Sequence, residues 1–253
     1  MEKMFSELLF ERYLRSQGLD KFEFEKTWPG ILKKPDYTLD ASNSTLIFDV
    51  KEFPFKHPPA GLFYDDPSEP IRKKISDVRK QFQKFKDKSC SLVLYTHGYE
   101  RLLDPIAVNA AMYGQVGISI PFDQETGSSL GESKTIFSGR GKMIDDKSKR
   151  PQNTTLSSLI TLYEVDINGL RGNLSLAELW PKAKFADFVR IHNKRDLVPA
   201  VIVWENALAR IPLVRNLFTG PCDVRWAHDG QFLSRVFTGE IIKEYYPEDE
   251  NQK

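Results

Sequence analysis

Two carboxylates and one lysine have the types and the spacing that phosphodiester hydrolysis requires. Asp49 and Lys51 stand two residues apart in an apolar segment, so strand alternation would place both side chains on one face. Segments 37–39 and 45–53 have the pattern of a strand hairpin, which would bring Asp36 beside Asp49 near a strand end. The sequence therefore predicts two carboxylates and an ammonium in one small volume.

We expect a divalent cation at this position, because two nearby carboxylates repel each other unless a positive charge neutralises them. Hard oxygen ligands favour Mg²⁺, for which Mn²⁺ can substitute, and Mg²⁺ usually takes one or two carboxylates and keeps several waters. Asp36 and Asp49 would bind the ion, which would polarise a phosphodiester and lower the pKa of a bound water. Lys51 would position the attacking water and stabilise charge on the phosphate oxygens.

The Pro-Asp pair ending at Asp36, followed at hairpin distance by Asp49-Val50-Lys51, resembles the signature of the PD-(D/E)XK nuclease superfamily of restriction-endonuclease-like proteins. The resemblance covers roughly residues 4–122. It implies a mixed central sheet flanked by helices, a Mg²⁺-dependent active site and cleavage of nucleic acid, with DNA favoured over RNA as the substrate. Cleavage of both strands by one site per chain would favour a homodimer or a larger complex.

The resemblance also implies two helical contributors to the site. Members often have an acidic residue on a helix before the first motif, and Glu7 and Glu11 lie one turn apart in the expected helix 4–17. We prefer Glu7 as the metal-site residue, acting through an intervening water, because it borders the apolar stripe; Glu11 is the alternative. Many members carry a Gln or a basic residue on the next helix, where Gln81 of helix 70–88 would orient the site.

A basic helix and a basic loop supply candidate contacts to a phosphate backbone. Residues 71–88 contain eight basic and two acidic residues, whereas the whole chain has a formal net charge of +1. A basic stripe attracts a nucleic-acid backbone, although taken alone such a stripe is more often a solvated helix face. The predicted nucleic-acid-binding residues are Arg72, Lys73, Lys74, Arg79 and Lys80 on the helix and Arg140 and Lys142 in the loop.

The alternation of expected elements favours one α/β domain over residues 1–253, with a nuclease-like core over residues 1–122. Residues 123–155 are expected to form a basic flexible loop, and residues 156–253 a C-terminal α/β extension packed on the core. We expect the tail from residue 240 to be frayed. The expected helices are 4–17, 70–88, 105–113 and 176–192, and the expected strands are 21–28, 37–39, 45–53, 91–96, 116–122, 156–166 and 200–204.

Composition excludes several other classes. A hydrophobic fraction of 40% opposes a disordered chain, and two cysteines oppose both a disulfide scaffold and the iron–sulfur branch of this superfamily. No apolar run approaches a membrane span and no signal-peptide segment stands at the N-terminus, so we expect a cytoplasmic protein without membrane contact. Residues 127–131 (GSSLG) match the sequence pattern of a serine nucleophile elbow, but the strand and helix that must flank such an elbow are not expected there.

One histidine is a further candidate for the site. His97 follows an expected strand and could line the cleft.

Two other functions stay open on the sequence alone. The chain could be a nucleic-acid-binding or interaction protein that retains the nuclease fold without cleaving. It could also be a structural protein of the same layered architecture, in which Asp49 and Lys51 form only an ion pair. The complete set of two acids and one lysine favours the nuclease, because loss of one carboxylate is the usual route to inactivity.

Overall fold

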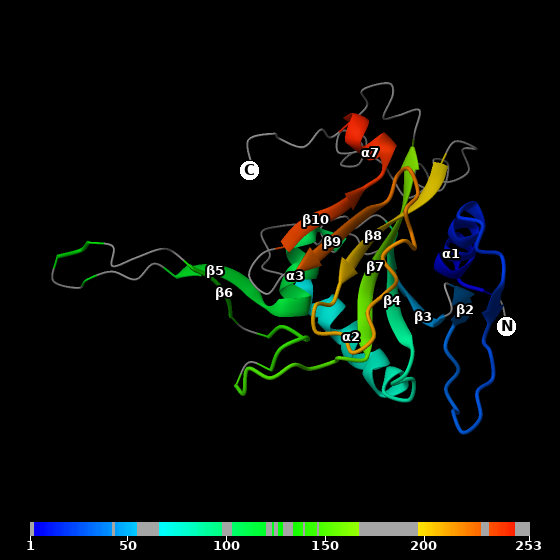
Figure 1. Ribbon diagram of the computed structural model, residues 1–253, viewed down its shortest axis with the longest axis horizontal. Coiled ribbons are helices and arrows are strands. Elements are labelled where there is room, and N and C mark those ends of the chain that lie inside the picture. The colour runs from blue at the N-terminus through cyan, green and yellow to red at the C-terminus, as the bar shows by residue number, and fades with distance from the viewer. Residues whose placement is uncertain are drawn as a thin grey trace.

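The computed structural model contains an eight-stranded mixed sheet with helices on both faces (Figure 1). It describes residues 3–41, 44–54, 66–97, 103–119, 123, 126–128, 134–138, 140–145, 147–166, 197–228 and 233–245. In spatial order the strands are β1 (Phe22–Phe24), β2 (Tyr37–Ala41), β3 (Ser44–Phe53), β4 (Ser89–Thr96), β7 (Leu156–Asp166), β8 (Leu197–Glu205), β9 (Val224–His228) and β10 (Leu233–Thr238). The helices are α1 (Phe5–Ser16), α2 (Ser68–Phe82), α3 (Pro105–Tyr113) and α7 (Glu240–Tyr245).

Parallel and antiparallel pairs of strands both occur across the sheet. Strands β1, β2 and β3 are antiparallel neighbours, whereas β3, β4 and β7 run parallel. Strand β8 is antiparallel to β7 and parallel to β9, and β10 ends the sheet antiparallel to β9. The parallel strands are covered on both faces, which explains why their sequences are apolar on both faces. The predicted α/β class with a mixed sheet flanked by helices is therefore confirmed.

Strand β3 separates two hydrophobic cores, because successive side chains of a strand point to opposite faces. On one face Phe48 and Val50 pack in a core with Phe10 and Leu14 of α1. On the other face Ile47 belongs to the core formed with α2 and α3. Figure 1 accordingly shows α1 on the side of the sheet away from α2 and α3. The side chains of β3 thus reach helices on both faces.

Helix α2 buries the apolar stripe that its period predicts, but its bounds differ from the expected 70–88. The helix begins at Ser68 and ends at Phe82, and residues 83–88 follow it in turns. There the Phe85 N–H donates to the Phe82 carbonyl at 2.9 Å, three residues back. The Phe85 side chain is buried with the α2 stripe. An apolar period continues past the last helical residue, which is why the sequence overestimated the helix.

The stretch expected to be one long flexible loop contains regular structure. Strand β6 (Lys134–Ser138) pairs with β5 (Gln115–Ser119) as a ribbon that projects from the body of the molecule in Figure 1. Farther along, Met143 is fully buried and its N–H donates to the Met112 carbonyl at 2.7 Å. Gly141 passes so close to the end of α3 that an added Cβ would lie 2.2 Å from a backbone atom of Tyr113. One buried methionine and one close glycine hold this segment, and neither is conspicuous in a polar sequence.

Three other expectations differ from the structure. The expected strand 21–28 is reduced to β1, since Glu25 turns into the left-handed region at φ 47°. The tail expected to fray from Glu240 begins with α7. Strands β9 and β10 were not predicted. The expected helix 176–192 lies outside the described residues.

Candidate active site

The side chains of Asp49 and Lys51 lie together on the face of β3 that α2 and α3 cover. Asp49 is 0% exposed, because β3 is an interior strand between β2 and β4. The Lys51 ammonium forms an ion pair with Asp49 Oδ1. It also lies 3.5 Å from Asp36 Oδ2 and donates to the Val50 carbonyl at 3.2 Å. Strand alternation thus produces the predicted carboxylate–lysine pair at the wall of a core.

Asp36 is held beside this pair by the register of the β2–β3 hairpin. Tyr37 pairs with Phe48, so Asp36 precedes β2 by one residue and lies next to Asp49. Its Oδ2 accepts the backbone N–H of Val50 at 2.6 Å, and its own carbonyl accepts the N–H of Glu25 at 2.9 Å. These bonds fix the carboxylate at the strand end.

The electrostatics of the three groups are those of a crowded acidic site. Burial and the adjacent charge of Asp49 raise the pKa of Asp36 to about 6, against the lowering effects of Lys51 and the Val50 N–H. Burial alone would lower the pKa of Lys51, but the charges of Asp49 and Asp36 outweigh it and raise that pKa above its usual value. Lys51 is therefore an ammonium at neutral pH, and Asp36 is close to its point of protonation.

Three predicted or neighbouring side chains of this region carry a buried oxygen atom without a hydrogen-bond partner in the described part of the chain. Among the described residues, no donor reaches Oδ2 of Asp49. The same holds for Oε1 of Gln81 and Oγ1 of Thr38. The Gln81 amide donates to the Lys34 carbonyl at 3.1 Å, so α2 is tied to the turn that precedes Asp36. A buried acceptor oxygen normally has a hydrogen-bond partner. The unpartnered Oδ2 of Asp49 could therefore accept a donor or bind a cation.

The donor set fits Mg²⁺. Asp36 and Asp49 supply hard carboxylate oxygens, and the unpartnered Oδ2 of Asp49 is available for a cation. In the described part of the chain, no group of three or more His, Cys, Asp or Glu side chains could hold a metal. A two-carboxylate site suits Mg²⁺, which keeps several of its waters, better than it suits an ion that needs a full protein cage.

The two acids of α1 differ in how far their carboxylates are engaged. Glu7 is mostly buried, its Oε2 accepts the Met4 N–H at 2.7 Å, and its charge helps to raise the pKa of Asp36. Glu11 forms ion pairs with Lys3 and Arg15 and accepts the Tyr37 hydroxyl at 3.0 Å. Burial alone would raise the pKa of Glu11, but its contacts with Lys3, Tyr37 and Arg15 outweigh burial and lower that pKa. Glu7 acts on the Asp36 site from the α1 face of the sheet, whereas Glu11 is occupied by its neighbours.

The contacts of Glu52, the residue after Lys51, were not predicted. Glu52 follows Lys51 and points to the α1 face, where its Oε2 accepts the Ser6 N–H at 2.9 Å. Its Oε1 contacts Nε2 of His97, which follows β4. Although burial raises it, the donors at Ser6 and His97 lower the pKa of Glu52 overall. Glu52 therefore ties the start of α1 and the end of β4 to β3, and only the position of His97 after a strand hinted at this.

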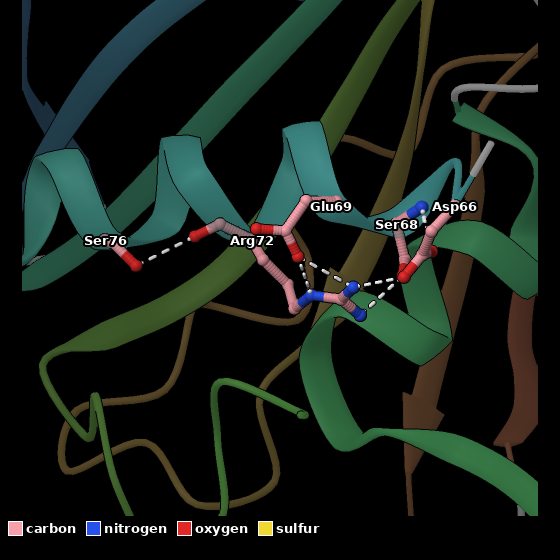
Figure 2. A network of polar contacts seen from close by, with 5 residues as sticks. All are labelled: Asp66, Ser68, Glu69, Arg72 and Ser76. Carbon is pink, nitrogen blue, oxygen red and sulfur yellow. Dashed lines mark hydrogen bonds and ion pairs between the residues drawn. The ribbon is translucent and has the colours of Figure 1, made fainter. Parts of the chain in front are cut away.

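Arg72, one of the predicted nucleic-acid-binding residues, has structural partners. It is 6% exposed, and its guanidinium donates to Ser68 Oγ at 2.5 Å and to Glu69 Oε2 at 2.9 Å (Figure 2). It also forms an ion pair with Asp66. Arg72 thus closes the first turn of α2 and differs from the free surface cation that the sequence predicts.

The other predicted basic residues are more accessible. Lys73, Arg79 and Lys80 are exposed, and the described part of the chain offers none of them an ion pair. Lys74 is half-buried, with its ammonium 5.4 Å above the Phe53 ring. Arg140 is exposed and Lys142 half-buried in the segment after β6.

Comparison of the chain with models of protein families, with curated proteins and with solved structures finds no match. Among the described helices, none is long and apolar enough to cross a membrane.

Proposed function

We propose that this protein is a Mg²⁺-dependent phosphodiesterase that hydrolyses nucleic acid, with DNA as the favoured substrate. The observation that carries the proposal is the fully buried Asp49, which has Lys51 on one oxygen and no partner among the described residues on the other. Such an arrangement does not stabilise the fold, because burying a carboxylate with too few hydrogen-bond partners costs folding free energy. It is useful where a cation and a phosphate must meet.

The residues divide the chemistry between them. Asp36 and Asp49 would hold the cation, which when bound polarises the phosphodiester and favours ionisation of a water. Lys51 supplies a positive charge to a non-bridging phosphate oxygen and orients the attacking water. Gln81 fixes the Lys34 carbonyl and hence the turn that presents Asp36. Glu7 adds negative charge near Asp36 from the other face of the sheet.

The substrate class is supported by the exposed cations of α2. Lys73, Arg79 and Lys80 lie on the helix that also carries Gln81, so a backbone that contacts them is close to the site. Arg140, which is exposed, and Lys142, which is half-buried, are further candidate phosphate contacts in the segment that follows β6. Arg72 is left out of this surface, because its guanidinium is paired within α2.

Cleavage assays with matched variants test the proposal. The purified protein is incubated with single- and double-stranded DNA and RNA in Mg²⁺, Mn²⁺ or EDTA. Cleavage should need the metal, and Asp49→Asn should lower its rate about a thousandfold or more, because a bound cation lowers the activation barrier by several kcal/mol. Lys51→Ala should also abolish it. Asp40→Asn on the same hairpin and Lys243→Ala on α7 are the controls, since both residues are exposed and lie outside the proposed site.

Each outcome assigns a different function. Metal-dependent cleavage that Asp40→Asn retains and Asp49→Asn loses supports the phosphodiesterase and identifies its substrate. Salt-sensitive nucleic-acid binding without cleavage in any metal rejects the enzyme in favour of a non-catalytic binding protein. Neither cleavage nor binding rejects both functions.

A further inference from the structure

The Lys51 ammonium lies where a divalent cation would have to bind. It forms an ion pair with Asp49 Oδ1, lies 3.5 Å from Asp36 Oδ2 and donates to the Val50 carbonyl at 3.2 Å. These two carboxylates are the proposed cation ligands. Without a metal, the lysine therefore supplies the positive charge that the fully buried Asp49 needs.

We infer that Lys51 is a placeholder for the cation: divalent metal binding displaces its ammonium from Asp49, and the freed ammonium then reaches the substrate phosphate. This inference rests on the proposed function. A Mg²⁺ ion needs carboxylate oxygens at about 2.0–2.1 Å with near-octahedral geometry. An ammonium in contact with the same carboxylate competes for that space, and the two positive charges repel each other at such short range.

The side chain of Lys51 is able to make this movement. Its side chain is 22% exposed, whereas the Asp49 side chain is 0% exposed, so the lysine has a route to solvent and the carboxylate does not. A lysine ammonium is a compact charge on a flexible four-carbon stem, unlike a planar guanidinium. The unpartnered Oδ2 of Asp49 gives the cation a first point of attachment before the ammonium leaves Oδ1.

Displacement couples two steps that the proposed reaction needs. While the site is empty, the ammonium is held by Asp49 and Asp36 and cannot serve a phosphate. Once a cation neutralises the carboxylates, the attraction that holds Lys51 disappears. The positive charge is thus released toward the substrate only after the metal has loaded.

Metal affinity provides the first test. Mn²⁺ and Mg²⁺ binding to the full chain, without nucleic acid, is measured by titration calorimetry for the wild type and for Lys51→Met. Removal of the competing charge should tighten the Kd about tenfold or more, the size of effect that one adjacent charge has on a proton equilibrium. Lys51→Arg, which keeps the charge, should not tighten binding. Lys84→Met, an exposed lysine after α2, should leave the Kd unchanged.

Movement of the lysine is tested on the wild type, which also covers the case that Lys51→Met does not fold. The ¹⁵Nζ resonance of Lys51 is followed by NMR while diamagnetic Mg²⁺ is added. It should shift and exchange faster with water at saturation. Binding of Mg²⁺ with an unchanged Lys51 resonance, or a Lys51→Met Kd equal to or weaker than the wild type's, overturns the placeholder and leaves the proposed function intact. Absence of divalent binding in both proteins overturns both.

Discussion

Two aspartates of this protein are equally buried and yet differently satisfied. Asp49 is 0% exposed and Asp223 is 1% exposed. Asp223 accepts the Tyr13 hydroxyl at 2.6 Å, the Gly220 N–H at 2.6 Å and the Val201 N–H at 2.9 Å. Asp49 has one ammonium on Oδ1, and no donor among the described residues reaches its Oδ2. Burial alone therefore does not separate a fully hydrogen-bonded carboxylate from one with an unpartnered oxygen.

The difference lies in which donors are supplied and whether they are permanent. The donors of Asp223 join α1, β8 and the turn before β9, so its charge helps to assemble distant parts of the chain. Its three neutral donors reach both carboxylate oxygens. The partner of Asp49 is a single flexible side chain that can leave. A carboxylate of the first kind stabilises the fold, and one of the second kind is available to a cation.

The same substitution should destabilise the protein at Asp223 and change its stability little at Asp49. In Asp223→Asn the new amide must face the donors of Tyr13 and Gly220 or that of Val201, so the unfolding free energy should fall by about 2–4 kcal/mol. In Asp49→Asn the amide nitrogen can take the place of the unpartnered Oδ2, so the change should stay within about 1 kcal/mol. Urea denaturation in EDTA measures both values. Equal losses in the two variants would remove the distinction between the two carboxylates.

Asp36 offers a smaller and pH-dependent effect. Its pKa in the folded protein is about 6, above the ordinary 3.8, because of burial and the charge of Asp49. The folded state therefore binds this proton more tightly than the unfolded chain does. The stability that results is complete below about pH 4 and is lost as the pH rises through 6.

Replacement of Asp36 removes this pH dependence. Between pH 4 and pH 7 in EDTA, the unfolding free energy of Asp36→Asn should rise relative to that of the wild type by about 1–3 kcal/mol. The neutral amide oxygen can still accept the Val50 N–H, so the hairpin is retained. Asp40→Asn, which replaces an exposed residue of the adjoining strand β2, should follow the wild-type profile. Parallel profiles for Asp36→Asn and the wild type would mean that folding does not raise the pKa of Asp36.

Local patterns explain which of these features the sequence could predict. Asp49 and Lys51 share a face because strand alternation fixes it, and a short hairpin fixes the position of Asp36 beside them. In each case the relevant contacts lie within one element or between neighbours in the chain.

Long-range partners set the features that the sequence could not predict. Asp223 depends on Tyr13 at the other end of the chain, and Glu52 depends on Ser6 and His97. Arg72 is different, because its partners are local: Asp66 precedes the helix, and Ser68 and Glu69 lie in its first turn. Hydrophobic periodicity identifies which face of a helix or strand is buried, but it does not identify the residue of another element that contacts that face.

Arg72 and Lys73 allow the smallest of these comparisons, between a paired cation and a free one on the same helix. Arg72→Met removes the donors to Asp66, Ser68 and Glu69, so stability should fall by about 1–2 kcal/mol. Lys73→Met removes an exposed charge without an ion pair in the described residues, so stability should change by less than about 0.5 kcal/mol.

Binding to DNA should rank the same two variants in reverse. The slope of log K against log salt should decrease in magnitude by about 1 in Lys73→Met, because one phosphate contact is lost, and should not change in Arg72→Met. Fluorescence anisotropy with labelled DNA in EDTA, over a range of salt concentrations, measures this slope without cleavage. A reduced slope in Arg72→Met would show that its pairing within α2 does not keep it from the substrate. An unchanged slope in Lys73→Met would remove the exposed face of α2 from the proposed interface.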